Sequence, residues 1–253
     1  MDIMTLHSYN EYRDVDSPSL KVALISILTS VYAVLYYLPV GFPLIGVEGA
    51  RPISLAYFIV IVISILFPLE ISVSSIALGG LIVSLIQLAP PFYILNFVPG
   101  VVMALATSIY FRRWFYPLPI YIPLIVIYAF YPGGGPIYTY PYHVIPHLIV
   151  LLLFTSLHIP HIYRFIGRYR DLVSSAFIGA FSGQAMGTLL FLILYYGFSF
   201  QSPEAITPIW VVTTYIYPIE RIVLVIGSII IYIGIRESIK RFLGGSIRLP
   251  LNL

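Results

Sequence analysis

Two opposite charges stand side by side in an apolar stretch near the end of the chain. Residues 217–234 read YPIERIVLVIGSIIIYIG, and Glu220 and Arg221 are the charged residues in them. A charge inside a bilayer is costly, so such residues face a bundle interior or a water-filled cavity and mark functional sites. Neighbouring side chains on a helix point about 100° apart. We therefore expect each charge to face its own partner, on another helix or on a ligand.

A further polar residue, Gln184, lies in the middle of the preceding apolar segment, in FIGAFSGQAMGTLL. Its depth is similar to that of Glu220 and Arg221, so we expect these side chains to meet. The small residues around Gln184 allow close helix packing, and they also leave space for a ligand. Two interpretations stay open: a structural ion-pair network between helices, or a polar cavity that opens outward and binds a small molecule.

Histidines offer little support for metal or acid–base chemistry. His143 and His147 are four residues apart and can share one helix face. We predict that they are interfacial histidines at an outer helix end, with ligand binding or metal binding as alternatives. Two histidines do not complete a zinc site, so we predict no metal and no cofactor. The sequence also lacks GxxxxGK, HExxH and GxSxG motifs, which favours a protein that is not an enzyme.

The composition places these residues in a membrane protein. Hydrophobic residues make up 60% of the 253 residues, whereas charged residues make up 9%; soluble domains carry roughly 25%. The apolar runs are continuous rather than alternating, which predicts an all-α, polytopic integral membrane bundle and not a barrel. Since a span needs about 20 residues, we predict about eight transmembrane helices, with six or seven as alternatives. The eight apolar segments are 21–39, 52–68, 71–89, 94–112, 117–131, 143–160, 172–197 and 208–236.

Basic residues orient the predicted helices. With a cytoplasmic N-terminus, eleven of the 13 lysines and arginines fall on the inner side, while Arg51 is outside and Arg221 is in the membrane. This predicts a multi-pass protein of the cell membrane with both termini cytoplasmic and no nucleic-acid partner. The first residues are polar and do not resemble a cleavable signal peptide. We predict a polar cytoplasmic segment at 1–20, a single transmembrane domain at 21–241 and a cytoplasmic tail at 242–253.

The first apolar segment carries a stripe of small residues. Ala23, Ser26, Ser30 and Ala33 recur at steps of three, four and three, which places them along one helix face. Such a face favours tight packing against another transmembrane helix. That helix belongs either to this same subunit or to a partner protein, and the pattern leaves both possibilities open.

Several stretches resemble the substrate-binding S components of energy-coupling factor (ECF) transporters. They are ALISILTSVYAVLYYLP, LFPLE continuing into ISVSSIALGGLIVSLI, NFVPGVVMALATSIYFRRW and YPIERIVLVIGSIIIYIGIRESIKRF, which cover about half of the chain. Three features depart from that family. S components usually have six helices, so the segments at 117–160 would be an extra pair. The small-residue stripe is half serine. The chain begins MDIM, without the histidine of the nickel and cobalt branch.

The resemblance implies a membrane subunit for the uptake of a vitamin-like micronutrient. Such a subunit captures its small-molecule ligand at the outer side of the bilayer and docks on a coupling transmembrane subunit driven by ATPase subunits. The docking face would be Ala23, Ser26, Ser30 and Ala33. The ligand site would draw on Glu48, Arg51, Asn96, Gln184, Trp210, Glu220 and Arg221. Alternative functions are a membrane scaffold or assembly subunit, and a membrane enzyme that uses Glu220 or a histidine for acid–base chemistry.

Overall fold

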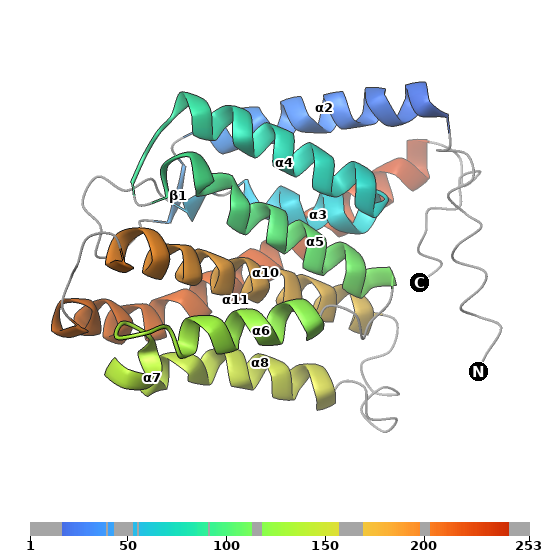
Figure 1. Ribbon diagram of the computed structural model, residues 1–253. Helices are drawn as coiled ribbons and strands as arrows, with labels where there is room; N and C mark the ends of the chain where they lie inside the picture. The colour runs from blue at the N-terminus through green and yellow to red at the C-terminus, as the bar shows by residue number, and fades with distance from the viewer. Residues whose placement is uncertain are drawn as a thin grey trace.

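The chain folds as a bundle of helices with one short strand pair (Figure 1). The structure, a computed structural model, describes residues 17–38, 40–42, 53–54, 56–90, 92–112, 118–156, 169–197 and 203–242. Its long helices are α2 (Pro18–Tyr37), α4 (Leu69–Ile86), α5 (Val98–Arg112), α10 (Arg170–Phe191) and α11 (Pro203–Phe242). The shorter elements are β1 (Gly41–Phe42), β2 (Ile53–Ser54), α3 (Tyr57–Leu66), η2 (Tyr93–Phe97), α6 (Leu118–Ala129), α7 (Pro136–Thr139), η3 (Pro141–Val144), α8 (Ile145–Ser156) and the π-helical turn η5 (Leu192–Gly197).

Five helices in the described ranges are long and apolar enough to cross a membrane. They are Pro18–Tyr37, Leu69–Ile86, Tyr93–Phe111, Arg170–Leu194 and Glu204–Ile239. The helices α3, α6 and α8 have 10, 12 and 12 residues. At about 1.5 Å per residue these three are about half as long as the roughly 30 Å hydrocarbon core. An all-α membrane-embedded bundle therefore agrees with the structure, whereas eight crossings and an S-component fold stay predictions.

Successive helices run in opposite directions. Followed by colour in Figure 1, α2 begins and α11 ends at the same end of the bundle, where α4 and α10 also begin. At the opposite end, β1 and β2 pair antiparallel, with Gly41 opposite Ser54. The connections η2 and α7–η3 lie at that opposite end as well. These described connections thus share one end of the bundle, which the basic residues predict to be the outer end.

The helix α10 is the centre of the bundle and packs closely on α5. Within its spanning window 72% of the residues are buried, compared with 11% for α2. The contact depends on glycines: a Cβ at Gly179 would meet Thr107 Oγ1 and would lie 3.1 Å from the carbonyl oxygen of Met103. A Cβ at Gly183 would lie 2.9 Å from the carbonyl oxygen of Pro99. One apolar core lies on the α2, α3 and α4 side of this helix pair and a second on the α6 and α8 side.

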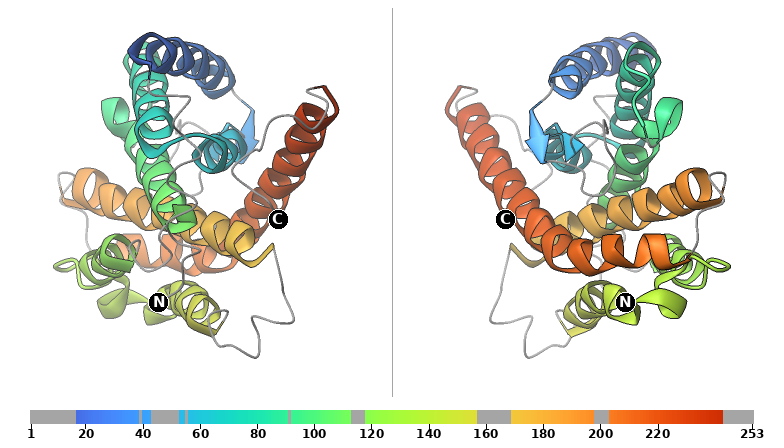
Figure 2. Two further views of the ribbon diagram at one scale, coloured as in Figure 1. Left: turned by 90° about the vertical axis from the view of Figure 1, so that its right-hand side faces the viewer. Right: turned by 90° about the vertical axis from the view of Figure 1, so that its left-hand side faces the viewer.

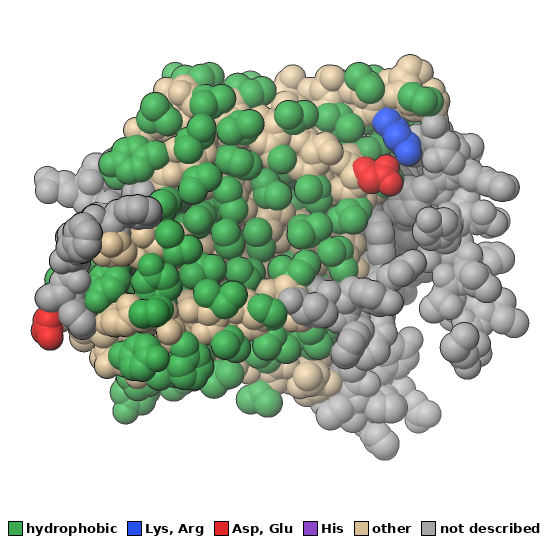
Figure 3. Space-filling model, in the orientation of Figure 1, with side chains coloured by type: hydrophobic (Ala, Val, Ile, Leu, Met, Phe, Trp, Pro, Cys, Tyr) green, Lys and Arg blue, Asp and Glu red, His purple; other side chains and the backbone are tan. Residues whose placement is uncertain are grey.

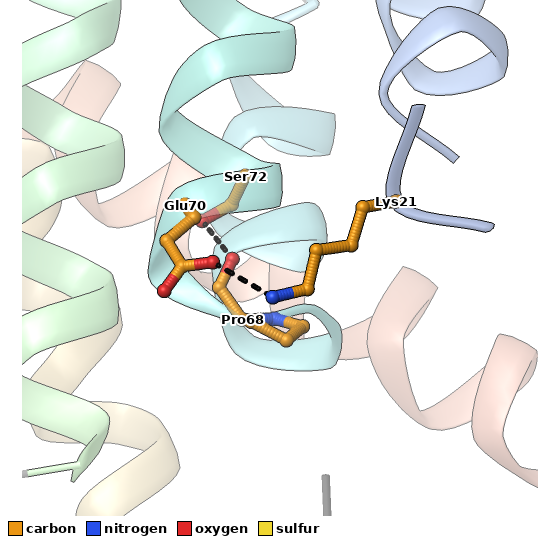
Figure 4. A network of polar contacts seen from close by, with 4 residues as sticks. All are labelled: Lys21, Pro68, Glu70 and Ser72. Carbon is orange, nitrogen blue, oxygen red and sulfur yellow. Dashed lines mark hydrogen bonds and ion pairs between the residues drawn. The ribbon is translucent and has the colours of Figure 1, made fainter. Parts of the chain in front are cut away.

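The helix α2 is held mainly by α4. Gly79 of α4 approaches the backbone of Thr29, and Tyr32 packs beside it. At one end of the contact, Lys21 and Glu70 form an ion pair of 3.4 Å (Figure 4). Near the same end of α4, the Ser72 hydroxyl donates to the carbonyl of Pro68, four residues earlier. Because the Glu70 side chain is exposed, this pair adds at most about 1 kcal/mol, and the apolar contact carries most of the attachment.

The helix α11 continues through two prolines. It is 40 residues long and contains Pro208 and Pro218. The apolar segment predicted at 208–236 starts later than this helix, which begins at Pro203, where a proline suits the first helical turn. The helix also continues through Pro218. Figure 2 shows the orange first part and the red last part of α11 running in different directions, as a proline bend would produce.

The outer surface of the bundle is apolar over most of the face seen in Figure 3. Hydrophobic side chains cover the described helices, and charged ones appear only near two opposite ends of this face. Exposed residues of this kind include Val22 and Val34 of α2 and Leu152 of α8, each more than 60% exposed. This distribution suits contact with lipid chains rather than water.

We expect Gly179→Ala to destabilise the protein by about 1–3 kcal/mol, because the added methyl group must displace α5. Thermal unfolding in detergent measures the effect. The control is Gly234→Ala on α11, where no atom lies within 4 Å of the added Cβ and the greater helix propensity of alanine contributes up to about 1 kcal/mol. Equal melting temperatures for the two variants would contradict close α10–α5 packing.

Candidate functional site

A cavity of about 80 Å³ lies where α3, α5, α10 and α11 meet. Its walls come from the start of α3, the η2–α5 unit, the second half of α10 and the first half of α11. These parts belong to the half of the bundle that also contains β1, η2 and α7, at its predicted outer end (Figure 1). The lining residues are Tyr57, Phe92, Pro99, Met103, Gly183, Gln184, Gly187, Thr188, Phe191, Ile209, Trp210, Thr213, Tyr217 and Arg221. Three residues predicted for a ligand site, Gln184, Trp210 and Arg221, are therefore brought together.

Arg221 is the charged residue of this lining. It is 4% exposed, and its Nε has no hydrogen-bond partner in the described part of the chain. Glu220 approaches it to 3.8 Å, so the two neighbours do face each other, contrary to expectation. That distance is too long for a hydrogen bond. Glu220 is buried but lies outside the cavity lining, and its Oε2 also has no hydrogen-bond partner among the described residues. The pair is a loose ion contact that leaves donors of Arg221 unused.

Gln184 lines the same cavity from the neighbouring helix, α10. Its side chain is 7% exposed, and within the described structure its Oε1 accepts no hydrogen bond. The glycines beside it serve two purposes. Gly179 and Gly183 bring α10 against α5, whereas the ring of Pro99, 3.7 Å from an added Cβ, is the one close neighbour of Gly187 among the described residues. Close packing therefore explains Gly179 and Gly183, and Gly187 leaves space in the cavity.

Trp210 is a fixed wall of the cavity. Its Nε1 donates to the carbonyl of Gly134 at 3.2 Å, which ties α11 to the glycine-rich connection before α7. The ring also packs against His143 at 4.7 Å between centroids and meets Phe191 edge-on. These contacts bury all but 2% of the side chain. The tryptophan can therefore stack on a ligand without losing its own position.

The two histidines lie behind Trp210 and do not face the lipid–water boundary. Both are buried, and the Tyr121 hydroxyl is 2.9 Å from Nδ1 of His147. Thr214 donates its single hydroxyl proton to the carbonyl of Trp210, so His143 Nδ1 is the donor in its contact with Thr214. The Nε2 of His143 then carries a lone pair. Aromatic packing explains the burial, since Tyr128 contacts both imidazole rings.

The other predicted residues fall elsewhere. Asn96 is outside the cavity lining and donates from its amide to the carbonyls of Ala89 and Tyr93, both at 2.9 Å, so it holds the turn before α5. Glu48 and Arg51 lie outside the described residues. His158 and His161 also lie outside the described residues. Of the small-residue stripe, Ala23, Ser26 and Ser30 are exposed and Ala33 is half-buried.

Hydropathy did not predict the aromatic and small residues of the lining. A spacing signal was nevertheless present around the polar residues. Positions 210, 213, 217 and 221 of α11, and positions 184, 187, 188 and 191 of α10, follow the spacing of one helix face. Extending one face from Arg221 and one from Gln184 recovers most of the lining of these two helices.

Comparison with known proteins adds no relative: no family model, no curated protein and no solved structure matches the chain.

Two buried amides give a matched test of the site. We expect Gln184→Leu to leave the free energy of unfolding unchanged or to raise it by about 1 kcal/mol, because it removes a buried acceptor with no hydrogen bond. Asn96→Leu is the control, since Asn96 is equally buried, at 7% exposed, but hydrogen-bonded. It should destabilise by about 1–3 kcal/mol by leaving two carbonyls without donors. Chemical unfolding in detergent compares the two variants, and equal losses would show that Gln184 is a structural group.

Proposed function

We propose that this protein is the substrate-binding subunit of an ECF-type importer for a small, vitamin-like micronutrient. The observation that carries the proposal is the cavity itself. It joins Gln184, Trp210 and Arg221 from two helices, and both Gln184 and Arg221 bring an unused polar atom. Unpaired buried polar groups cost stability, so a ligand that supplies their partners explains their presence. The cavity lies in the half of the bundle that the basic residues predict to be outermost.

A docking role for α2 supports the same proposal. The helix is peripheral, with 11% of its spanning window buried. Ser26 and Ser30 donate their hydroxyl protons to carbonyls four residues earlier, at 2.8 and 2.9 Å. With these protons used inside the helix, the stripe presents small side chains that a partner helix can approach closely. The expected partner is a coupling subunit driven by ATPases.

Filling the cavity should abolish ligand capture. We expect Gly187→Leu to eliminate a small molecule that co-purifies with the unaltered protein, because the new side chain extends into the space beside Pro99. Mass spectrometry of extracts from the purified protein detects the ligand. Gly234→Leu adds the same side chain to the exposed side of α11 and should retain it. The absence of any ligand from the unaltered protein, together with a stable protein partner, would favour the scaffold function.

A larger side chain in the small-residue stripe of α2 should block docking on the coupling subunit and leave ligand binding unchanged. We expect Ser30→Phe to prevent co-purification with the coupling subunit encoded in the same genome, because the ring holds the partner helix away. Val31→Phe is the control, since Val31 is also exposed but points about 100° away on the same helix. Ligand binding should survive in both variants. Equal association of the two variants with the coupling subunit would exclude this face as the docking surface.

A further inference from the structure

We infer that the cavity selects a small aromatic monocarboxylate that also carries a hydrogen-bond donor. This inference rests on the proposed ligand-binding function and names the chemical class of the ligand. Its first support is charge. Among the described lining residues Arg221 is the cation, and no carboxylate joins it in the lining. An arginine stays protonated in proteins and offers five N–H donors in a planar fork.

Glu220, the ion-pair partner of Arg221, accepts no hydrogen bond from the guanidinium group. Its carboxylate stays 3.8 Å away. A buried cation without hydrogen bonds is strongly unfavourable. A carboxylate is planar and can accept two parallel hydrogen bonds from a guanidinium, so it matches the unused donors in both charge and geometry. Because Arg221 is the one arginine among the described lining residues, one negative charge is the expected number.

The second support is the polar group opposite. Gln184 Oε1 is a buried acceptor without a donor in the described structure. Thr213 donates its hydroxyl proton to the carbonyl of Ile209 at 2.7 Å, so it too presents an oxygen that can only accept. The cavity therefore pairs donors on Arg221 with acceptors on Gln184 and Thr213. A ligand that satisfies both carries an N–H or O–H group in addition to its carboxylate.

The third support is the shape and chemistry of the walls. Aromatic side chains line the cavity from four elements or connections, and they are Tyr57, Phe92, Phe191, Trp210 and Tyr217. Such walls favour a flat ring by stacking and edge contacts. The volume of about 80 Å³ is several times the minimum that holds one water, so the cavity suits a small ligand such as a single substituted ring.

Binding of matched probes tests the charge requirement. In a Trp114→Phe background Trp210 is the remaining tryptophan, and its fluorescence reports on the cavity. We expect 4-hydroxybenzoate to change this emission and to bind at least tenfold more tightly than 4-hydroxybenzamide, which has the same shape without the charge. Arg221→Met should remove this preference. Arg236→Met, which alters a buried arginine elsewhere on α11, should keep it.

Equal binding of the acid and the amide, no binding of the acid, or an unchanged preference in Arg221→Met would each overturn the inference. Benzoate tests the donor requirement and should bind more weakly than 4-hydroxybenzoate. The outcomes also separate this inference from the proposed function. Capture of an uncharged ligand together with docking on the coupling subunit would leave the importer function intact and refute the ligand class. Arginine-dependent binding of the acid without docking would do the reverse.

Discussion

The close approach of α10 to α5 is the contact on which the rest of the bundle depends. It requires two positions without a side chain, Gly179 and Gly183, facing the α5 backbone. Because α10 is the most buried of the spanning helices, both apolar cores are built against this pair. The α2, α3 and α4 side gains its stacked tyrosines at positions 32, 36 and 57, and the α6 and α8 side gains its buried histidines. Lipid cannot supply a hydrophobic driving force between helices, so such backbone-to-backbone packing is the main source of association.

The cavity is a direct result of how that contact ends. One turn beyond Gly183, the next glycine, Gly187, meets only the edge of Pro99. Pro99 lies in the first turn of α5 and has no backbone N–H, so it leaves no donor of its own unpaired where the two helices separate. The opening is then walled by α3 and α11. Polar atoms of Arg221 and Gln184 stay unpaired at this point, which is the stability cost that functional sites commonly carry.

Charge and polarity pointed to two residues that line the cavity, Gln184 and Arg221. Hydropathy could not identify the aromatic and small residues of its walls. Gln184 and Arg221 stand out because a polar group inside an apolar run needs a reason to be there. Phe191 or Tyr217 do not stand out, because lipid-facing and cavity-facing aromatic residues look alike in composition. Asn96 attracts the same attention as Gln184, yet its amide serves the local backbone. The start of α11 at Pro203 and its bend near Pro218 were not predicted either. A proline can begin, bend or end a helix, and packing against the neighbouring helices decides which of these occurs.

The length of α11 couples the cavity to the membrane around it. Its candidate span, Glu204–Ile239, has 36 residues and extends for about 54 Å, far more than the roughly 30 Å hydrocarbon core. To fit this length into the hydrocarbon core by tilt alone, the helix would have to tilt by more than the usual limit of about 40°. The bend of α11 accommodates the excess, and Pro218 lies between Tyr217 and Arg221 near the middle of the helix. Because the bend lies at the helical turn that carries Arg221, a change in bilayer thickness would strain the same turn that lines the cavity.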